Sequence, residues 1–267
     1  MLSHAKTSRS ERKKLASTDG EEQQPYESIM ESIIWDQTKF SFSEKDIQFV
    51  AGGVLDGAAD TSVFTAFHFL TQALAAHPHV QRRAQEEIDA VLGHKSVPEE
   101  GKIDMLKLPY LAACVTEILR WWPTSASGSP RVCLADQVIL GHRIPKGSIV
   151  IMNIWALSHD PDEYDRRDHF EPERFLRNPW GTKHSRANQD SDSSWRKPIY
   201  AFGAGRRECP GQQYGLEALH VAFELVLWAY DIVADQELDL SPSGIKCETY
   251  VSMWKCKRVN FMCVFYF

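Results

Sequence analysis

The segment Phe202-Gly-Ala-Gly-Arg-Arg-Glu-Cys-Pro-Gly211 constrains the fold of this 267-residue chain more than any other feature. Its glycines permit a tight turn, and Pro210 suits the first turn of a helix, where a missing N–H is no loss. A cysteine between such a turn and a helix start can be kept as a thiolate by backbone N–H groups and by the helix amino terminus. The segment therefore predicts a reactive Cys209 and a final helix that runs to about Tyr230. The alternative is a glycine-rich loop around a buried structural cysteine.

Every defined position of this segment matches a Phe-x-x-Gly-x-Arg-x-Cys-x-Gly signature, so the chain resembles the cytochromes P450. The resemblance implies that Cys209 is the thiolate ligand of the iron of haem b, a ligand that favours O–O cleavage. It also implies that Arg131, Phe202, Arg207 and Gly211 contribute to haem binding. An arginine there can form a charge-assisted contact with a haem propionate. For Arg131 the alternative is an ordinary arginine at the start of a strand.

A long apolar segment follows Ser43, which is a plausible helix N-cap with Asp46 three residues later. The apolar residues continue to about Leu74, which predicts one unusually long helix. Apolar side chains occupy most of its faces, so the helix should be buried. Three internal glycines each cost about 1 kcal/mol against alanine, which indicates that another group approaches the helix backbone closely.

Within this helix, the residues from Gly57 to Ser62 resemble the acid–alcohol segment of the same family. The resemblance implies that Asp60 and Thr61 are catalytic and relay protons to oxygen, which is a general-acid role. The alternative is a packing face of small residues with one polar side chain turned to solvent.

Glu117 and Arg120 lie three residues apart and so share a helix face. On its own, such a pair is an everyday surface ion pair of little energetic value. With the later Pro172-Glu-Arg-Phe175, however, it is similar to the family's Glu-x-x-Arg helix and its partner segment. The resemblance implies that Glu117, Arg120 and Arg174 form a buried structural network that locks the loop before Cys209.

The remaining pattern predicts a mainly α fold with small β-sheets, and the resemblance makes it the carboxy-terminal portion of the cytochrome P450 fold. Further helices are expected from Pro78 to about Val91 and from Leu108 to Trp121. Short β-like runs are expected at residues 131–134, 137–140 and 148–153. A long irregular region should extend from about residue 160 to residue 200.

Residues 1–40 are polar and are expected to form a disordered or loop-like segment, whereas the resemblance implies that residues 41–267 form the haem-binding portion of a cytochrome P450 domain. The tail at residues 246–267 is atypical of the family: it is either read-through of unspliced sequence or a genuine terminal strand. A net charge of −6 argues against a nucleic-acid partner. The sequence shows no signal peptide or spanning segment. The resemblance implies a place on the cytosolic face of the endoplasmic reticulum, and the alternative is a cytoplasmic location.

The resemblance implies a haem-thiolate monooxygenase that inserts one atom of O2 into a small hydrophobic organic substrate. Electrons would come from NADPH through NADPH-cytochrome P450 reductase, and likeness to fungal microsomal members points to secondary metabolism. The alternative is a truncated, inactive cytochrome P450 fragment, because the family's long amino-terminal half is not visible before Phe40. A third reading, peroxide rearrangement without a reductase, is disfavoured by Asp60 and Thr61, since it needs no proton relay.

Overall fold

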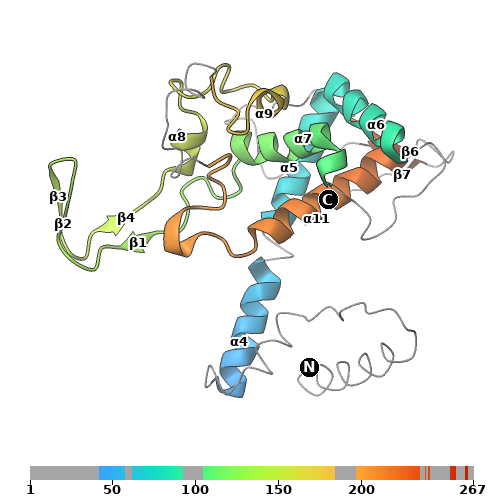
Figure 1. Cartoon of the computed structure of the whole chain (residues 1–267). Coiled ribbons are helices and arrows are strands. Elements are labelled where there is room, and N and C mark those ends of the chain that lie inside the picture. Colours follow the sequence, from blue (N-terminus) through green and yellow to red (C-terminus); the bar gives the residue numbers. More distant parts are fainter. Residues whose placement is uncertain are drawn as a thin grey trace, which may run out of the picture. The chain divides into compact units, whose positions relative to one another are not determined.

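The computed structural model describes residues 42–57, 62–92, 105–183, 197–234, 238, 240, 253–256 and 262–263. The chain divides into two compact units, Met1–Thr61 and Ser62–Phe267. Figure 1 draws their helices and strands, and each unit is described separately below.

In the first unit, helix α4 spans Glu44–Leu55 and begins with the expected capping box. The Ser43 hydroxyl accepts the Asp46 N–H at 3.3 Å, and the Asp46 carboxylate accepts the Ser43 N–H at 2.9 Å. These bonds use two backbone donors that a helix start leaves unpaired. The predicted N-cap is therefore confirmed.

The prediction that this helix is buried on most faces is wrong for α4. Ile47 is buried, but Phe49 and Leu55 are 85% and 65% exposed. The reason is that the described part of its unit, residues 42–57, contains no second element to cover the helix. An added Cβ at Gly52 or Gly53 would meet nothing within 4 Å, so within the described residues 42–57 no group approaches these glycines.

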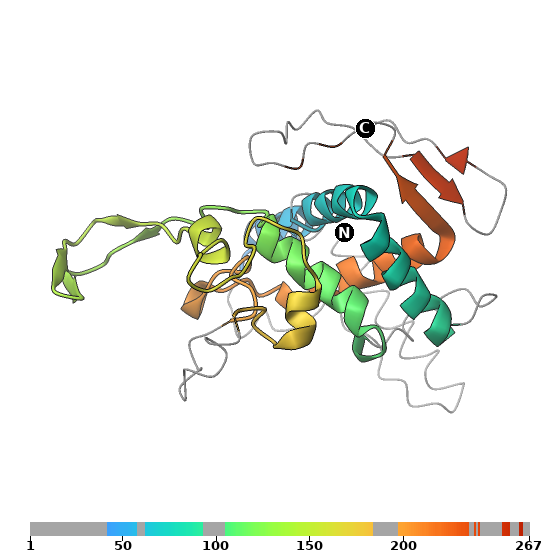
Figure 2. The same cartoon turned by 90° about the horizontal axis from the view of Figure 1, so that it is seen from above.

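The core of the second unit consists of four helices that all pack on one another. They are α5 (Ser62–Ala76), α6 (Pro78–Leu92), α7 (Pro109–Trp121) and α11 (Gln212–Ala229), and Figures 1 and 2 show them crossing at the centre of the unit. In α6, Val80, Ala84 and Ile88 are fully buried, because residues four apart share a helix face. The predicted helices beginning at Pro78, at Leu108 and after Pro210 are confirmed within two residues.

Short antiparallel strands complete the second unit. Strand β1 (Arg131–Val132) pairs with β4 (Ile149–Val150), with Arg131 opposite Val150. Between them, β2 (Gln137–Ile139) and β3 (His142–Ile144) form a hairpin that projects from the helices in Figures 1 and 2. Strand β3 was not among the predicted runs, because its charged and aromatic residues break the apolar alternation that marks a strand.

A third sheet follows directly from α11. Strand β5 (Tyr230–Val233) pairs with β6 (Met253–Cys256), which pairs with β7 (Met262–Cys263). The Gln81 side chain of α6 binds β5 through both backbone groups of one residue: it donates to the Ile232 carbonyl at 2.9 Å and accepts the Ile232 N–H at 2.6 Å. The atypical tail thus contributes strands, and the expected mainly α fold with small β-sheets is confirmed.

Candidate functional site

The loop before α11 is closed by its own backbone. Gly203 and Gly205 have φ values of +74° and +69°, in the left-handed region that glycine adopts without strain. The Cys209 N–H donates to the Phe202 carbonyl at 2.9 Å, and the Glu208 N–H donates to the Gly205 carbonyl at 3.0 Å. The tight turn that the glycines predicted therefore forms, and its amides at Glu208 and Cys209 are engaged within the turn.

Cys209 itself is exposed, three residues before the start of α11. An added Cβ at Gly211 would lie 3.8 Å from the Cys209 sulfur, so Gly211 leaves open space beside the thiol. The alternative of a buried structural cysteine is wrong for Cys209; it describes Cys114, which is fully buried in α7. The thiol is thus accessible from outside the protein and is not part of the core.

Phe202 ties the loop to α11. Its ring lies 3.6 Å from the position of an added Cβ at Gly215, one turn into the helix, and it packs on the edge of the hydrophobic core. In this structure its observed contact is therefore with the helix that follows Cys209. This contact fixes where the loop leaves the core.

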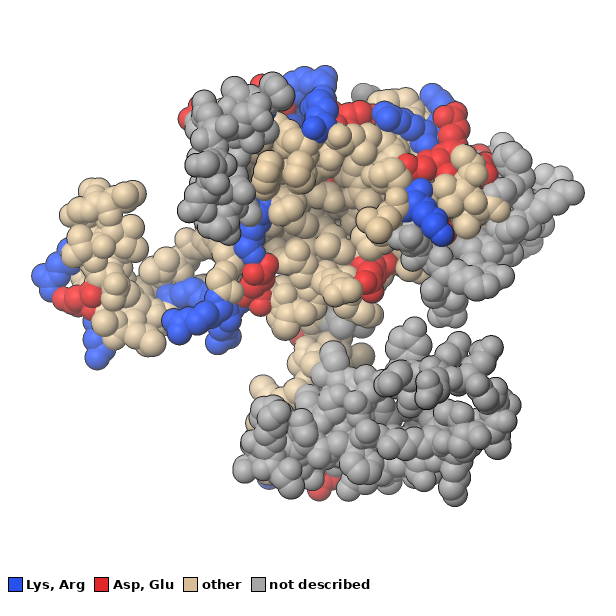
Figure 3. Space-filling view, in the orientation of Figure 1, with Lys and Arg blue, Asp and Glu red and all other residues tan. Residues whose placement is uncertain are grey.

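Two arginines meet at the loop. Arg131, at the start of β1, donates from Nη2 to the Arg207 carbonyl at 3.4 Å, which brings the Arg131 guanidinium to the backbone of the turn that carries Arg207. In Figure 3 basic surface gathers between the projecting hairpin and the helices, where β1 and the short 3-10 helix η3 (Gly205–Arg207) lie in Figure 1. An exposed thiol with cationic groups nearby fits a haem, which offers an iron to the sulfur and carboxylates to the arginines.

Glu117, Arg120 and Arg174 meet in the core, at 0–1% exposure. Arg120 donates to the two Glu117 carboxylate oxygens from Nε and Nη2, each at 2.8 Å. Arg174, in helix α9 (Glu173–Arg177), donates from Nε to the same carboxylate at 3.1 Å. One carboxylate therefore holds two guanidinium groups, and its oxygens have the partners that a buried charge needs.

The outward N–H groups of both arginines bind main-chain carbonyls. Arg120 donates to the carbonyls of Ser158, Arg167 and His169, while Arg174 donates to those of Asp165 and Arg166. The network thus fixes the irregular segment at residues 158–169, which begins at the end of helix α8 (Ile154–Ser158). Residues 184–196, which lead toward the Cys loop, lie outside the described residues, so the direct lock on that loop stays a prediction.

Glu171 is a member of this cluster that the sequence did not single out. Burial raises the pKa of its carboxyl, but hydrogen bonds from Arg166 and Arg177 outweigh burial and hold the pKa below its usual range. The distances are 2.7 Å from Arg166 and 3.0 Å from Arg177. The sequence feature that could have identified Glu171 is its position directly before the Pro172-Glu-Arg-Phe segment.

A second buried acid, Glu224, lies on α11 one turn after His220, and neither residue was predicted. Both side chains are at most 1% exposed, and the His220 Nδ1 lies 4.0 Å from a Glu224 carboxylate oxygen. Burial raises the pKa of Glu224 to about 7 and lowers the pKa of His220, because it disfavours the charged form of each. The pair lies in the helical core, 11 residues or more from Cys209.

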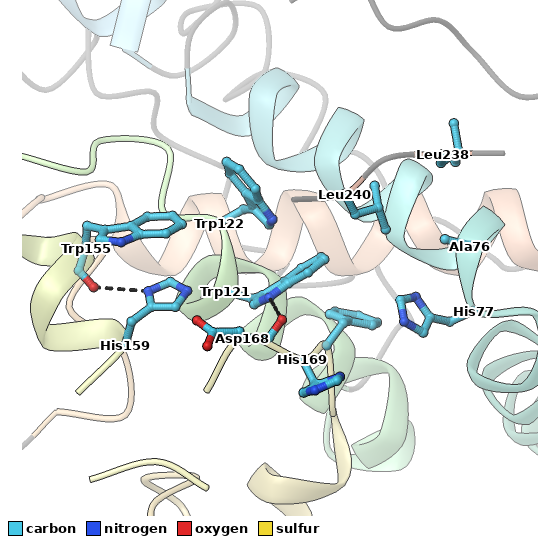
Figure 4. Close-up of a pocket in the computed structure, with 11 residues that line it drawn as sticks. Ala76, His77, Trp121, Trp122, Trp155, His159, Asp168, His169, Leu238 and Leu240 are labelled. Carbon is cyan, nitrogen blue, oxygen red and sulfur yellow. Dashed lines mark hydrogen bonds between the residues drawn. The ribbon is translucent and has the colours of Figure 1, made fainter. Parts of the chain in front are cut away.

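An aromatic cavity of about 420 Å3 lies at the carboxy-terminal end of α7, away from the Cys loop. Figure 4 shows Trp121, Trp122 and Trp155 along it, with neighbouring ring centroids 6.0 and 5.5 Å apart. The indole N–H of Trp121 donates to the Asp168 carbonyl, and His159 bonds the Trp155 carbonyl. Burial lowers the pKa of His159. This cavity continues the packing around Arg120 and brings none of the predicted site residues together.

Asp60 and Thr61 lie outside the described residues, so their relay role stays a prediction. Among the residues that the structure describes, no group of three or more His, Cys, Asp or Glu side chains is placed to hold a metal ion. Within that same part of the chain, no helix has both the length and the apolar character needed to cross a bilayer.

A family model described as Cytochrome P450 matches residues 3–249. A cytochrome P450 monooxygenase of Armillaria gallica is 35% identical over 227 residues, which cover 79% of this chain and 42% of the relative. The monooxygenase patI of Aspergillus clavatus is 32% identical over 205 residues, which cover 77% of this chain and 38% of the relative. The chain thus spans about two fifths of the length of these relatives.

The fold has a solved counterpart. A zebra fish cytochrome P450, determined with abiraterone, superposes with a TM-score of 0.66 at 26% identity. The superposition covers 90% of this chain and 52% of that one. The similarity in structure therefore extends over nearly the whole chain.

Proposed function

This chain belongs to the cytochrome P450 family, and on that premise we propose that it is the haem-binding portion of a monooxygenase, with Cys209 as the axial ligand of haem b iron. The observation that carries the proposal is the exposed Cys209 thiol in a glycine turn directly before α11. When bound, the haem supplies the iron that activates O2 for insertion of one oxygen atom into the substrate.

The chain's own residues hold that group and set its surroundings. With haem bound, the Cys209 thiolate would be stabilised by the iron as well as by the amino terminus of α11. Arg131 and Arg207 would bind the haem carboxylates, while Phe202 and Gly211 define the loop on either side of the sulfur. Asp60 and Thr61 are proposed to move protons from solvent toward the reacting oxygen.

The Glu117–Arg120–Arg174 network has a structural role in this proposal. It touches none of the reacting atoms; it fixes the segment at residues 158–169 through main-chain carbonyls. Because five such bonds depend on two guanidinium groups paired with one carboxylate, loss of Glu117 would loosen the whole segment.

The substrate is proposed to be a small hydrophobic organic molecule, with electrons delivered from NADPH by NADPH-cytochrome P450 reductase. Family membership and the fungal monooxygenase relatives support these assignments, as well as a role in secondary metabolism and a place on the cytosolic face of the endoplasmic reticulum.

Thr61→Ala should uncouple O2 consumption from product formation, whereas unchanged coupling would remove Thr61 from the proton path.

The test is the carbon monoxide difference spectrum of the dithionite-reduced chain, expressed with haem supplied. The thiolate-type Soret band in the wild type, and its absence in Cys209→Ala, are expected. Cys114→Ala is the matched control, because that thiol is fully buried and should not affect ligation. A thiolate band that persists in Cys209→Ala, or no haem uptake by the wild type, would contradict the proposal.

A further inference from the structure

Lys197 and Glu208 form an ion pair across the Cys loop that the family signature does not contain. The Lys197 ammonium contacts the carboxylate of Glu208, the residue immediately before Cys209. The two side chains are 24% and 36% exposed, whereas the Arg143–Asp136 pair of the β2–β3 hairpin is 73% and 54% exposed. The pair at the loop is thus partly withdrawn from solvent, where a charge interaction is screened less.

The pair adds a side-chain link outside the backbone bonds of the turn. The backbone closes the loop between Phe202 and Cys209, while Lys197 reaches Glu208 from five residues before Phe202. The segment that enters the loop is therefore fixed to the peptide unit that carries Cys209.

The charges explain why a lysine is useful at this point. Glu208 is the only acidic residue between Lys197 and Gly211, and it adjoins the thiol that must remain negative as a ligand. Without a partner, its carboxylate would repel the thiolate or pair with the neighbouring arginines. Within the described residues no acidic side chain pairs with Arg207, so the Lys197 contact leaves that guanidinium available to a haem carboxylate.

We propose that Lys197 is a positioning residue of the haem site: it holds Glu208, and through Glu208 it fixes Cys209 and keeps Arg207 available. The inference rests on the proposed function for its effect on haem, but its effect on the loop exists without haem.

The test compares the wild type with Lys197→Met, Glu208→Gln and the double variant, with Arg143→Met as the matched control at an exposed ion pair. In the haem-free chain, hydrogen exchange of the Cys209 amide should become roughly fivefold faster in Lys197→Met, the upper range for one partly exposed pair. In the haem-loaded Lys197→Met chain, transfer of haem to apomyoglobin should accelerate by about the same factor. The carbon monoxide difference spectrum should also show a larger fraction of the neutral-thiol species than in the wild type.

Glu208→Gln removes the carboxylate charge next to Cys209 together with its ion pair to Lys197. The double variant should therefore match Glu208→Gln in the rate of haem transfer and in the carbon monoxide spectrum, because the effects of the two substitutions should not add. Additive effects, or Lys197→Met values equal to those of Arg143→Met in both forms of the chain, would overturn the inference. Failure of the wild type to bind haem would contradict the proposed function instead, and the Cys209 amide would still report on the link.

Discussion

The Glu117 network and the Cys209 loop are the two charge-bearing regions that the family motifs mark, and they are built in opposite ways. In the network three ionised side chains are at most 1% exposed and are joined to one another and to five main-chain carbonyls. In the loop Cys209 and Arg207 are exposed, Arg131 beside it is half-buried, and main-chain bonds hold the turn. The comparison shows a scaffold that satisfies its own charges and a binding loop that presents its reactive groups outward.

The difference has an energetic consequence. A buried carboxylate that holds two guanidinium groups cannot lose one member without leaving charge unpaired in the core. An exposed thiol can be removed with little effect on folding, because it makes few packing contacts and its removal leaves no cavity in the core. Stability should therefore depend on the first region and haem ligation on the second.

The largest effect is expected for Glu117→Gln, which leaves Arg120 buried without its Glu117 counter-charge and Arg174 with the Glu171 carboxylate at 3.5 Å as its remaining ion pair. The free energy of unfolding should fall by about 3–5 kcal/mol, measured by urea denaturation. The matched control is Glu217→Gln, at an exposed acid of α11 whose side chain accepts from Gln213. That change should stay within about 0.5 kcal/mol. A decrease of less than 1 kcal/mol in the free energy of unfolding of Glu117→Gln would show that stability does not depend on the network more than on the loop.

Glu224, a buried carboxyl without the arginine partners of Glu117, tests whether burial or ion pairing determines how a carboxyl affects stability. The pKa of Glu224 is raised from 4.5 to about 7 in the folded state, so between these pH values the folded chain holds a proton that the unfolded chain has lost. Its contribution to stability is therefore present below pH 4.5 and falls by about 3 kcal/mol as the pH rises to about 7.

His220 acts in the opposite sense, because its pKa is lowered: its contribution rises as the pH approaches 6.5 from below. Subtracting the urea-derived stability of Glu224→Gln from that of the wild type, at each pH from 4 to 8, should isolate the Glu224 fall. A flat difference would show that the carboxyl is not perturbed by its burial.

Gly181 tests the packing that surrounds the network. Its φ is +65°, and an added Cβ would lie 2.9 Å from a ring carbon of Phe175 and 3.1 Å from Arg174 Cγ. Gly181→Ala should therefore destabilise the fold by about 2 kcal/mol, through strain and overpacking together. Gly147→Ala is the control, since its φ is +88° but nothing lies within 4 Å of the new methyl. Equal shifts in the thermal midpoint would show that the backbone alone accounts for the effect.

The smallest change in stability is expected for Cys209→Ala in the haem-free chain. Its free energy of unfolding should stay within about 0.5 kcal/mol of the wild type, because the thiol is exposed. The same variant should lose the thiolate-type band completely. A stability loss comparable to that of Glu117→Gln would mean that the loop belongs to the scaffold.

Much of the helical fold was accessible from local patterns. The helix expected from Pro78 to about Val91 is α6, whose buried residues Val80, Ala84 and Ile88 recur at helical spacing, and Pro210 marked the start of α11. Strand β3 was missed because His142 and Arg143 break the apolar alternation that marks a strand. The exposure of α4 was missed because a helix pattern shows which residues are apolar, not whether another element covers them.

The sequence by itself determined the turn and helix start around Cys209, since glycine at positive φ and proline at a helix start are local requirements of the backbone. Only the tertiary structure decided which charges meet. Glu117 and Arg174 are 57 residues apart, and Lys197 gains its significance only when the chain brings it to Glu208. Burial and pairing depend on contacts between distant segments, and these follow from packing of the whole core, which no local pattern records.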